Sequence, residues 1–371
     1  MPASLPCGER LVRCLGGGDC DRAPFGVGLG WAPWGSALAR WRRETGRNDL
    51  NPGRELGYEA GFALPDIAYG IFPGFDPVDI ADEGETRVWR DERGITRRDR
   101  KDGASMPEFL DYPVKTPEDW ERLKRERLQP DARRLRQDWA AFRARLAATG
   151  EAVQVGVFPW GPFGTVRDLM GAEELLIAFY DHPDMVHDMM DTLTGLWLWL
   201  YERVAAEVQI DHIHIWEDMS GRQGSLISPA MIESFMMPCY DRISAFAQTH
   251  GVRVVSMDSD GDVSQLLPLM TAHGVNAVMP FEVQAGSDVL AYRQRYPDLG
   301  IMYGLDKRAL TVAGPALERE LERCRAMLTG GRYLPGFDHL IPDDVPWEHF
   351  RRAALAIRDL CLHGERTSSC L

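Results

Sequence analysis

Acidic residues recur directly after short apolar runs in the second half of this 371-residue chain. The residues concerned are Glu217, Asp218, Asp258, Asp260, Glu282, Asp306 and Asp338, and His339 follows the last of them. Carboxylates that meet around one point repel one another, so such a cluster needs a proton, a cation or a basic substrate nearby. Carboxylate oxygens with one imidazole suit a divalent cation such as Mg, Mn, Fe or Zn.

We therefore expect a divalent metal centre that also does acid–base chemistry. Its ligands would be Asp258, Asp260, Asp338 and His339, and the expected catalytic residues are Glu217, Asp258, Asp260 and His339, with Glu217 as a ligand or a general base. The alternative is that each carboxylate only caps the helix after its strand, because Asp is a favoured N-cap residue. Glu217 and Glu282 are poor caps, and Asp258 and Asp260 supply two carboxylates where a cap needs one.

Side chains of other kinds accompany these carboxylates. The expected substrate-binding residues are Trp160, Phe163, Arg167, Asp218, Glu282 and Asp306, with the two aromatic rings as apolar walls. Lys307 and Arg308 directly follow Asp306, so they either neutralise it or bind an anion. His212 and His214 alternate with isoleucine and therefore share one face of their strand. Packing inside the protein is the favoured role for these two histidines.

The elements that position these residues alternate between short strands and helices. The expected strands are Ala152–Phe158, His212–Trp216, Val252–Met257, Ala277–Met279, Gly300–Tyr303 and Tyr333–Leu334. The helices expected between and after them are Val166–Tyr180, Pro183–Val208, Pro229–His250, Val263–His273, Ser287–Tyr296, Ala309–Leu328 and Trp347–Leu362. This alternation predicts βαβ units and a parallel sheet.

Six such units lie after residue 150, and Ile67–Phe72 is the candidate for an earlier strand. A count that approaches eight favours an α/β protein with a (β/α)8 TIM barrel over a doubly wound sheet. The sequence contains neither GxGxxG after a strand nor GxxxxGK[ST], so dinucleotide and P-loop sites lose support. In such a barrel the strand ends meet at one mouth, which would bring the carboxylates together.

The first 150 residues read as an elaboration of the same domain. Val88–Gly103 alternates as a solvated β-hairpin does. Thr116 as N-cap, followed by Pro117, predicts the start of a helix. We expect one domain over residues 1–371, with an N-terminal elaboration and the first barrel strands in 1–150 and regular βα units in 151–371.

The net charge, the longest apolar run and the cysteine content argue against several classes of partner and location. The 42 Lys+Arg residues face 56 Asp+Glu, and the net charge of −14 argues against nucleic acid or an anionic membrane surface as a partner. The apolar run Leu193–Tyr201 is far shorter than a membrane span. Seven cysteines without a CxxC motif predict reduced thiols in a cytoplasmic protein. We expect a small-molecule substrate and a homodimer.

Five stretches carry a resemblance to the uroporphyrinogen decarboxylase superfamily: ERLVRCLGGGDCDRAPF, PEFLDYPVKTPEDWERLK, GTVRDLMGAEELLIAFYDHPDMVHDMMD, EDMSGRQGSLISPAMIESFMMPCYDRI and GGRYLPGFDHLIPDDVPWEHF. The resemblance covers nearly the whole chain and implies a TIM barrel with its active site at the carboxyl ends of the strands. The superfamily contains porphyrinogen decarboxylases and methyltransferases that use a corrinoid or coenzyme M. The decarboxylases resemble one another in an RQAGRY segment, which this sequence lacks.

The chain is more similar to the methyltransferase-like branch. In that branch a His-x-Cys-Gly turn and a late Pro-Gly-Cys bind zinc. In this sequence the first motif reads Asp258-Ser259-Asp260-Gly261, and the second reads Pro335-Gly336-Phe337-Asp338-His339. Because carboxylates stand where that branch has thiolate and imidazole ligands, we expect a harder metal than zinc at the same place. The resemblance implies an enzyme that moves a methyl group from a small cationic or methoxylated donor to a corrinoid or to tetrahydrofolate. A corrinoid protein would then be a partner.

Two alternatives stay open. In the first, the protein decarboxylates uroporphyrinogen or a related polyacid, and Arg40, Arg42 and Arg43 bind the substrate carboxylates. In the second, it is a non-catalytic barrel that carries a corrinoid or another small molecule, because loss of the family's metal turn could also mean loss of activity.

Overall fold

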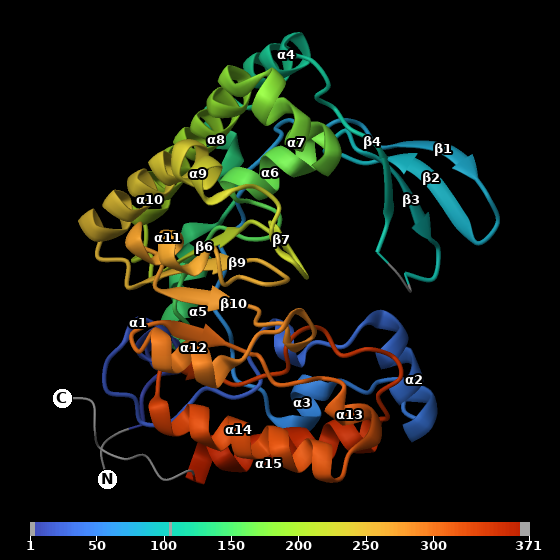
Figure 1. The fold of residues 1–371 in the computed structure, drawn as a ribbon, viewed down its shortest axis with the longest axis vertical. Helices are drawn as coiled ribbons and strands as arrows, with labels where there is room; N and C mark the ends of the chain where they lie inside the picture. The colour runs from blue at the N-terminus through green and yellow to red at the C-terminus, as the bar shows by residue number, and fades with distance from the viewer. Residues whose placement is uncertain (1–3, 104–105, 364–371) are drawn as a thin grey trace.

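A parallel sheet of six strands forms the centre of the computed structural model, which describes residues 4–103 and 106–363 (Figure 1). The strands run in the order β12–β11–β10–β9–β6–β5. Their bounds are β5 Gln154–Val155, β6 His212–Trp216, β9 Val254–Asp258, β10 Ala277–Met279, β11 Gly300–Met302 and β12 Tyr333–Leu334. Every residue of β6 and β9 is buried, as expected for a parallel sheet covered by helices.

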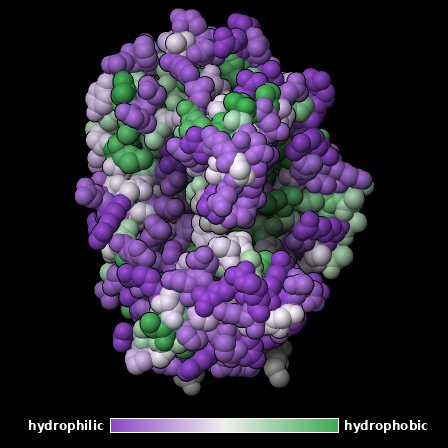
Figure 2. Space-filling view, turned by 90° about the vertical axis from the view of Figure 1, so that its right-hand side faces the viewer, coloured by the Kyte–Doolittle hydropathy of each residue, from purple (hydrophilic) through white to green (hydrophobic). Residues whose placement is uncertain are grey.

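A second sheet overhangs the end of the barrel at which the strands finish, which we call the mouth (Figure 1). It consists of four antiparallel strands, β1 Val78–Asp82, β2 Thr86–Arg90, β3 Thr96–Arg100 and β4 Glu108–Asp111. The predicted hairpin is confirmed as β2 and β3, whereas β1 and β4 were not expected. Most side chains on the face that carries this sheet are hydrophilic (Figure 2).

Helices cover the sheet and connect its strands. Those before β5 are α1 Cys7–Gly16, α2 Gly35–Thr45, α3 Pro52–Leu56, α4 Pro117–Arg127 and α5 Trp139–Thr149. Those after it are α6 Pro162–Met170, α7 Ala172–Asp181, α8 Pro183–Ala205, α9 Pro229–Met231, α10 Met237–Thr249, α11 Leu267–Ala272, α12 Val289–Arg295, α13 Ala309–Val312, α14 Pro315–Gly330 and α15 Trp347–His363. The predicted start of α4 is confirmed: Thr116 and Asp119 form a capping box. None of the described helices is both long and apolar enough to cross a membrane.

Three predicted helices are interrupted. Gly171 separates α6 from α7 with φ 87°, and a Cβ there would lie 2.6 Å from the ring of Tyr112. Gly314 separates α13 from α14 in the same way, with φ 62°. The expected helix over Pro229–His250 contains a π-helical turn at Ile232–Met236, shortly before Pro238, whose missing N–H cannot continue the α-helical pattern.

The predicted strand Ile67–Phe72 is wrong. Ile67 makes only a single antiparallel bridge, to Leu135. The carbonyl oxygens of Ala68 and Gly70 instead accept hydrogen bonds from the buried guanidinium of Arg134, at 3.0 and 2.5 Å. The N–H groups of Ala68 and Phe72 donate to the backbone carbonyls of Arg134 and Arg127, so the segment is satisfied by a loop and a side chain rather than by a neighbouring strand.

N-terminal segments join the two edges of the six-stranded sheet. Beyond β5, Ala63 forms a parallel bridge with Val153. Beyond β12, the backbone N–H of Phe337 donates to the carbonyl of Gly30 at 3.1 Å. The segments that contain Gly30 and Ala63 are themselves connected, because Glu59 N–H donates to Phe25 O at 3.0 Å. Contacts thus run around a closed circuit, which is the arrangement of the predicted (β/α)8 barrel.

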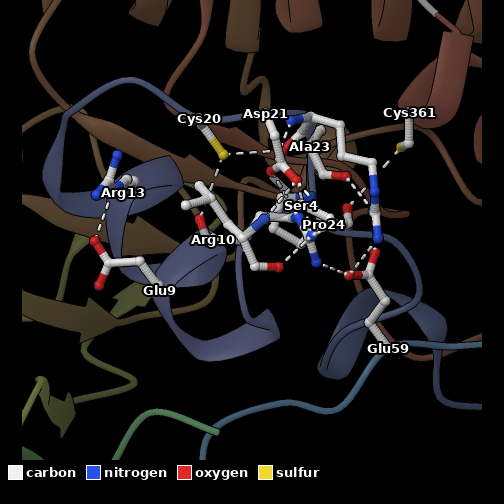
Figure 3. Close-up of polar contacts among 12 residues, drawn as sticks. Ser4, Glu9, Arg10, Arg13, Cys20, Asp21, Ala23, Pro24, Glu59 and Cys361 are labelled. Carbon is white, nitrogen blue, oxygen red and sulfur yellow. Dashed lines mark hydrogen bonds and ion pairs between the residues drawn. The ribbon is translucent and has the colours of Figure 1, made fainter. Parts of the chain in front are cut away.

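A buried network of charges stabilises this connection (Figure 3). Arg10 of α1 is 3% exposed and donates to Asp21 at 2.9 Å and to Glu59 at 2.7 Å. Glu59 also accepts from Arg22 at 2.5 Å and from the N–H of Phe25 at 2.8 Å. Buried charges are tolerated when they are paired and hydrogen-bonded in this way. The network ties α1 to the two segments that complete the barrel.

Candidate active site

A polar cavity of about 450 Å³ opens at the mouth, between the loops that follow β6, β9, β10, β11 and β12. Its volume is that of a small-molecule site. Its walls carry charges of both signs, from Arg222, Asp260, Glu282, Lys307, Arg308 and Asp338. The structure therefore brings acidic residues from three separate strand ends, those of β9, β10 and β12, to one cavity.

Asp258 is the last residue of β9 and lies two residues before the cavity-lining Asp260. Only 9% of it is exposed, yet no hydrogen bond from the described part of the chain reaches its carboxylate. Nε2 of His214 lies 3.8 Å from its Oδ2. Burial raises the pKa of Asp258 well above its usual value, and the negative charges of Asp260 and Asp218 raise it further. The surroundings of Asp258 therefore favour its protonated form over the carboxylate.

Asp260 shares this acidic environment. Burial raises the pKa of Asp260 to about 7, with further contributions from Glu282 and Asp218 that outweigh the opposing Lys307 and Arg167. Nε2 of His339 lies 3.6 Å from its Oδ1. Burial lowers the pKa of His339, and Lys307 lowers it further. Both shifts favour the neutral forms, so a proton shared between Asp260 and His339 resides on the carboxyl group more readily than it would in an exposed pair.

Asp338 is 1% exposed and engaged with its neighbours. Its carboxylate accepts from the N–H of Val283 at 3.1 Å and of Lys307 at 3.3 Å, and Nζ of Lys307 lies 3.6 Å away. It therefore connects the loops after β10, β11 and β12, with the ammonium group of Lys307 as its counter-ion.

The expected metal ligands do not come together as one set. Asp258 faces His214, Asp260 faces His339, and Asp338 faces Lys307. Within residues 4–103 and 106–363, no three His, Cys, Asp or Glu side chains are arranged to hold a metal ion. The thiolates of the related zinc site are replaced as well. The residues present fit neither the zinc centre of the resembling branch nor the harder centre that we expected.

Glu217 is fully buried and has three hydrogen-bond donors. It accepts from the N–H groups of Phe163 at 2.8 Å and Gly164 at 2.9 Å, and from the hydroxyl of Tyr240 at 2.7 Å. Burial raises the pKa of Glu217 to about 7 although these hydrogen bonds oppose the shift. An acidic side chain at a helix N-terminus complements the helix dipole. Glu217 thus connects α6 to the end of β6 and is not among the residues that line the cavity.

The expected substrate-binding residues separate into two groups. Phe163 is fully buried and stacks on Phe179, and Trp160 packs on Gly70 beside a small apolar pocket. Nearer the mouth, Arg167 donates to the carbonyl and the carboxylate of Asp218, both at 2.6 Å.

Two further expected residues hold the loops of the mouth. Glu282 lines the cavity and accepts from the N–H of Gly261 at 3.0 Å. Asp306 pairs with Arg308 at 2.7 Å. Although burial opposes the shift, hydrogen bonds from Arg308 hold the pKa of Asp306 below its usual value. Arg308 therefore neutralises Asp306, whereas Lys307 pairs with Asp338.

Sequence reasoning missed two features of the site. Phe158 is 61% exposed and packs edge-to-face on Trp216, 4.7 Å between ring centres, at the end of β6. Ser256 lies between His212 and His214 in the barrel interior. The alternation of β9 places Ser256 on the same face as Asp258, but only the pairing of β9 with β6 brings it to the histidines.

Comparisons with known proteins agree with this architecture. The family model described as uroporphyrinogen decarboxylase (URO-D) matches residues 97–360. Among solved structures, a methyltransferase from Methanosarcina mazei superposes with a TM-score of 0.60 at 18% identity, over 96% of this chain and 99% of that one. No curated protein matches the chain. Since the family model covers more than half of the sequence, the chain belongs to the uroporphyrinogen decarboxylase family and has the TIM-barrel fold of that family.

Proposed function

We propose that the protein is a methyltransferase that acts on a small methyl ether, with Asp258 as the general acid. The observation that carries this proposal is a buried carboxyl group, without a hydrogen bond from the described residues, at the end of a barrel strand. Catalytic residues of TIM barrels occupy such strand ends. A carboxylic acid that stays protonated at neutral pH is suited to protonate a leaving group.

The chemistry explains why an ether is the favoured donor. When the methyl group is transferred, the carbon–oxygen bond breaks and its electron pair stays on oxygen. The proton of Asp258 then converts the developing alkoxide or phenoxide into a neutral alcohol or phenol. A quaternary ammonium donor would leave as a neutral amine and would need no acid. A corrinoid or tetrahydrofolate acceptor, as the resemblance implies, would supply the nucleophile when bound.

The other residues of the mouth support this step. Asp260, whose pKa burial raises to about 7, is a second proton source two residues away. Arg167 holds the loop that carries Asp218, and Lys307 balances the charge of Asp338. Because the cavity has the size of a small ligand, a methyl acceptor as large as a corrinoid would approach it from outside.

The test follows the methyl group itself. Small methyl ethers labelled with ¹³C in the methyl group are incubated with the protein and reduced cobalamin or tetrahydrofolate, and the labelled product is measured. We expect Asp258→Asn to lower kcat by roughly 10²- to 10⁴-fold. Asp191→Asn is the matched control, because Asp191 is 72% exposed and pairs only with Arg242.

Two results would refute the proposal. One is a rate of methyl transfer in Asp258→Asn equal to that of the control. The other is conversion of uroporphyrinogen to coproporphyrinogen with no methyl transfer from any ether. The second result would favour the decarboxylase alternative. In the structure, Arg40 of that alternative donates to Glu44 and to the carbonyl of Asp343.

A further inference from the structure

Three polar side chains form a buried group inside the barrel, beside Asp258. His212 and His214 lie on β6 and Ser256 on the adjacent β9, and they are 2%, 8% and 0% exposed. The hydroxyl of Ser256 lies 2.7 Å from Nε2 of His212 and 2.9 Å from Nδ1 of His214. Buried polar groups are costly unless they satisfy one another, so their protons must be arranged consistently.

Few proton arrangements are possible. Burial lowers the pKa of His212 well below its usual value and that of His214 to about 4, so both rings are neutral and each carries one N–H. In the first arrangement, His212 Nε2–H donates to Ser256, and Ser256 donates to Nδ1 of His214. In the second, every donor and acceptor is reversed. If both rings donated to Ser256, neither facing nitrogen could accept a hydrogen bond from its hydroxyl group.

The free nitrogen of His212 decides between them. Its Nδ1 is buried and has no hydrogen-bond partner in the described part of the chain. The first arrangement leaves a lone pair at this position, whereas the second leaves an N–H. Buried N–H groups without a partner are rarer in proteins than acceptors without one. The first arrangement is therefore preferred, and it places the proton of His214 on Nε2, which faces Oδ2 of Asp258 at 3.8 Å.

We propose that Ser256 and His212 are positioning residues that hold His214 in its Nε2–H tautomer, so that this N–H stabilises the carboxylate that Asp258 becomes after it donates its proton. The catalytic part of this inference rests on the proposed function. The proton leaves Asp258 for the substrate oxygen, and His214 keeps its own proton throughout. The tautomer itself is a property of the free protein.

The surroundings of Asp258 explain why such a donor is needed. The charges that act on it are those of Asp260 and Asp218, and both oppose its ionisation. The nearby hydroxyl of Tyr303 donates to the carbonyl of Val27 at 3.2 Å. Of the described side chains, His214 is thus the neutral donor within reach of the new carboxylate.

The tautomer can be measured without any substrate. Nitrogen-15 NMR of the histidine-labelled protein distinguishes Nδ1–H from Nε2–H, and the spectra of His214→Gln and His212→Gln assign the two signals. We expect Nε2–H at His214 in the wild type and a mixture of tautomers in Ser256→Ala. Nδ1–H at His214 in the wild type would overturn the inference.

Kinetics test the catalytic part. Ser256→Ala should lower kcat roughly tenfold or more with little change in KM, because the N–H of His214 no longer faces the carboxylate that forms after substrate binds. His212→Phe should have the same effect, whereas His212→Gln should restore kcat, since its amide can still donate to Ser256. An unchanged kcat in Ser256→Ala and His212→Phe would overturn the proposed role. If the wild type transfers no methyl group, the proposed function fails, and the NMR result alone decides whether the tautomer is as inferred.

Discussion

Glu217 and Asp258 show how surroundings give two buried carboxyl groups different roles. Both follow or end a barrel strand, and burial raises the pKa of each. Glu217 accepts three hydrogen bonds, two of them from the first turn of α6. The carboxyl group of Asp258 accepts none from the described residues. The sequence places an acid at both positions, but only the structure shows that the first is hydrogen-bonded to neighbouring elements whereas the second, our proposed general acid, is not.

The raised pKa of Asp258 predicts a pH-dependent cost in stability. In the unfolded chain this group ionises above about pH 3.8, whereas in the folded protein it stays protonated to a much higher pH. The unfolded state therefore binds fewer protons above that pH, and stability falls as pH rises. Asp258→Asn removes this cost. Its stability relative to the wild type should be near equal at pH 4 and then rise by about 1.4 kcal/mol per pH unit until the folded protein also ionises.

Urea unfolding of both proteins between pH 4 and pH 8 measures this difference. The same series on Asp191→Asn, at the exposed position, should show no pH-dependent gain. A stability difference between Asp258→Asn and the wild type that does not change with pH would contradict the assignment of a protonated Asp258.

At the scale of elements, strands were predicted better than the ends of helices. His212–Trp216, Ala277–Met279 and Tyr333–Leu334 have the predicted bounds, because short apolar runs between polar loops identify buried strands. The strand at Ile67–Phe72 was wrong because Arg134, distant in the sequence, supplies its hydrogen bonds. The mouth was predicted from strand ends alone. The expected metal ligands do not meet as one set because side-chain direction, which periodicity does not give, turns Asp258 to His214 and Asp338 to Lys307 and leaves only Asp260 and His339 together.

The contact between β6 and α6 depends on Glu217. Glu217→Gln keeps the size of the side chain but replaces one acceptor oxygen by an amide donor. The N–H groups of Phe163 and Gly164 both donate to Oε2 and the hydroxyl of Tyr240 donates to Oε1, so the amide takes the place of one of these oxygens and at least one donor loses its acceptor. A buried donor without a partner costs about 1–3 kcal/mol, and we expect a loss of stability of that size in urea unfolding.

Tyr240→Phe supplies the matched variant for this contact, because it removes the donor to Oε1 of Glu217 and leaves both N–H groups on Oε2, so only an acceptor loses its partner. It should cost less than Glu217→Gln. If Glu217→Gln were as stable as the wild type, while losing activity, Glu217 would act in catalysis rather than in the attachment of α6.

At the scale of the molecule, the barrel depends on residues far outside the regular βα units. The strand order ends at β5 and β12, and the segments around Gly30 and Ala63 carry the contacts from one edge to the other. The sequence predicted an N-terminal elaboration with the first barrel strands in residues 1–150, but it did not identify the segments around Gly30 and Ala63, because single bridges leave no strand-like pattern. The ion pair between Arg10 and Glu59 could not be predicted from the sequence either, because each residue lies in a polar stretch where a charged side chain is ordinary.

Glu59→Gln tests whether this network stabilises the whole barrel. The change removes the charge that faces Arg10 and Arg22, and it leaves the buried guanidinium of Arg10 with Asp21 as its remaining acidic partner. Breaking a buried ion pair on one side costs about 3–5 kcal/mol. Glu318→Gln breaks an exposed pair with Arg352 instead, in which both side chains are about 60% exposed, and should cost under about 1 kcal/mol. If both variants unfolded at the same urea concentration, the connection at Glu59 would be dispensable, and the barrel would be held by its six paired strands and the helices that cover them.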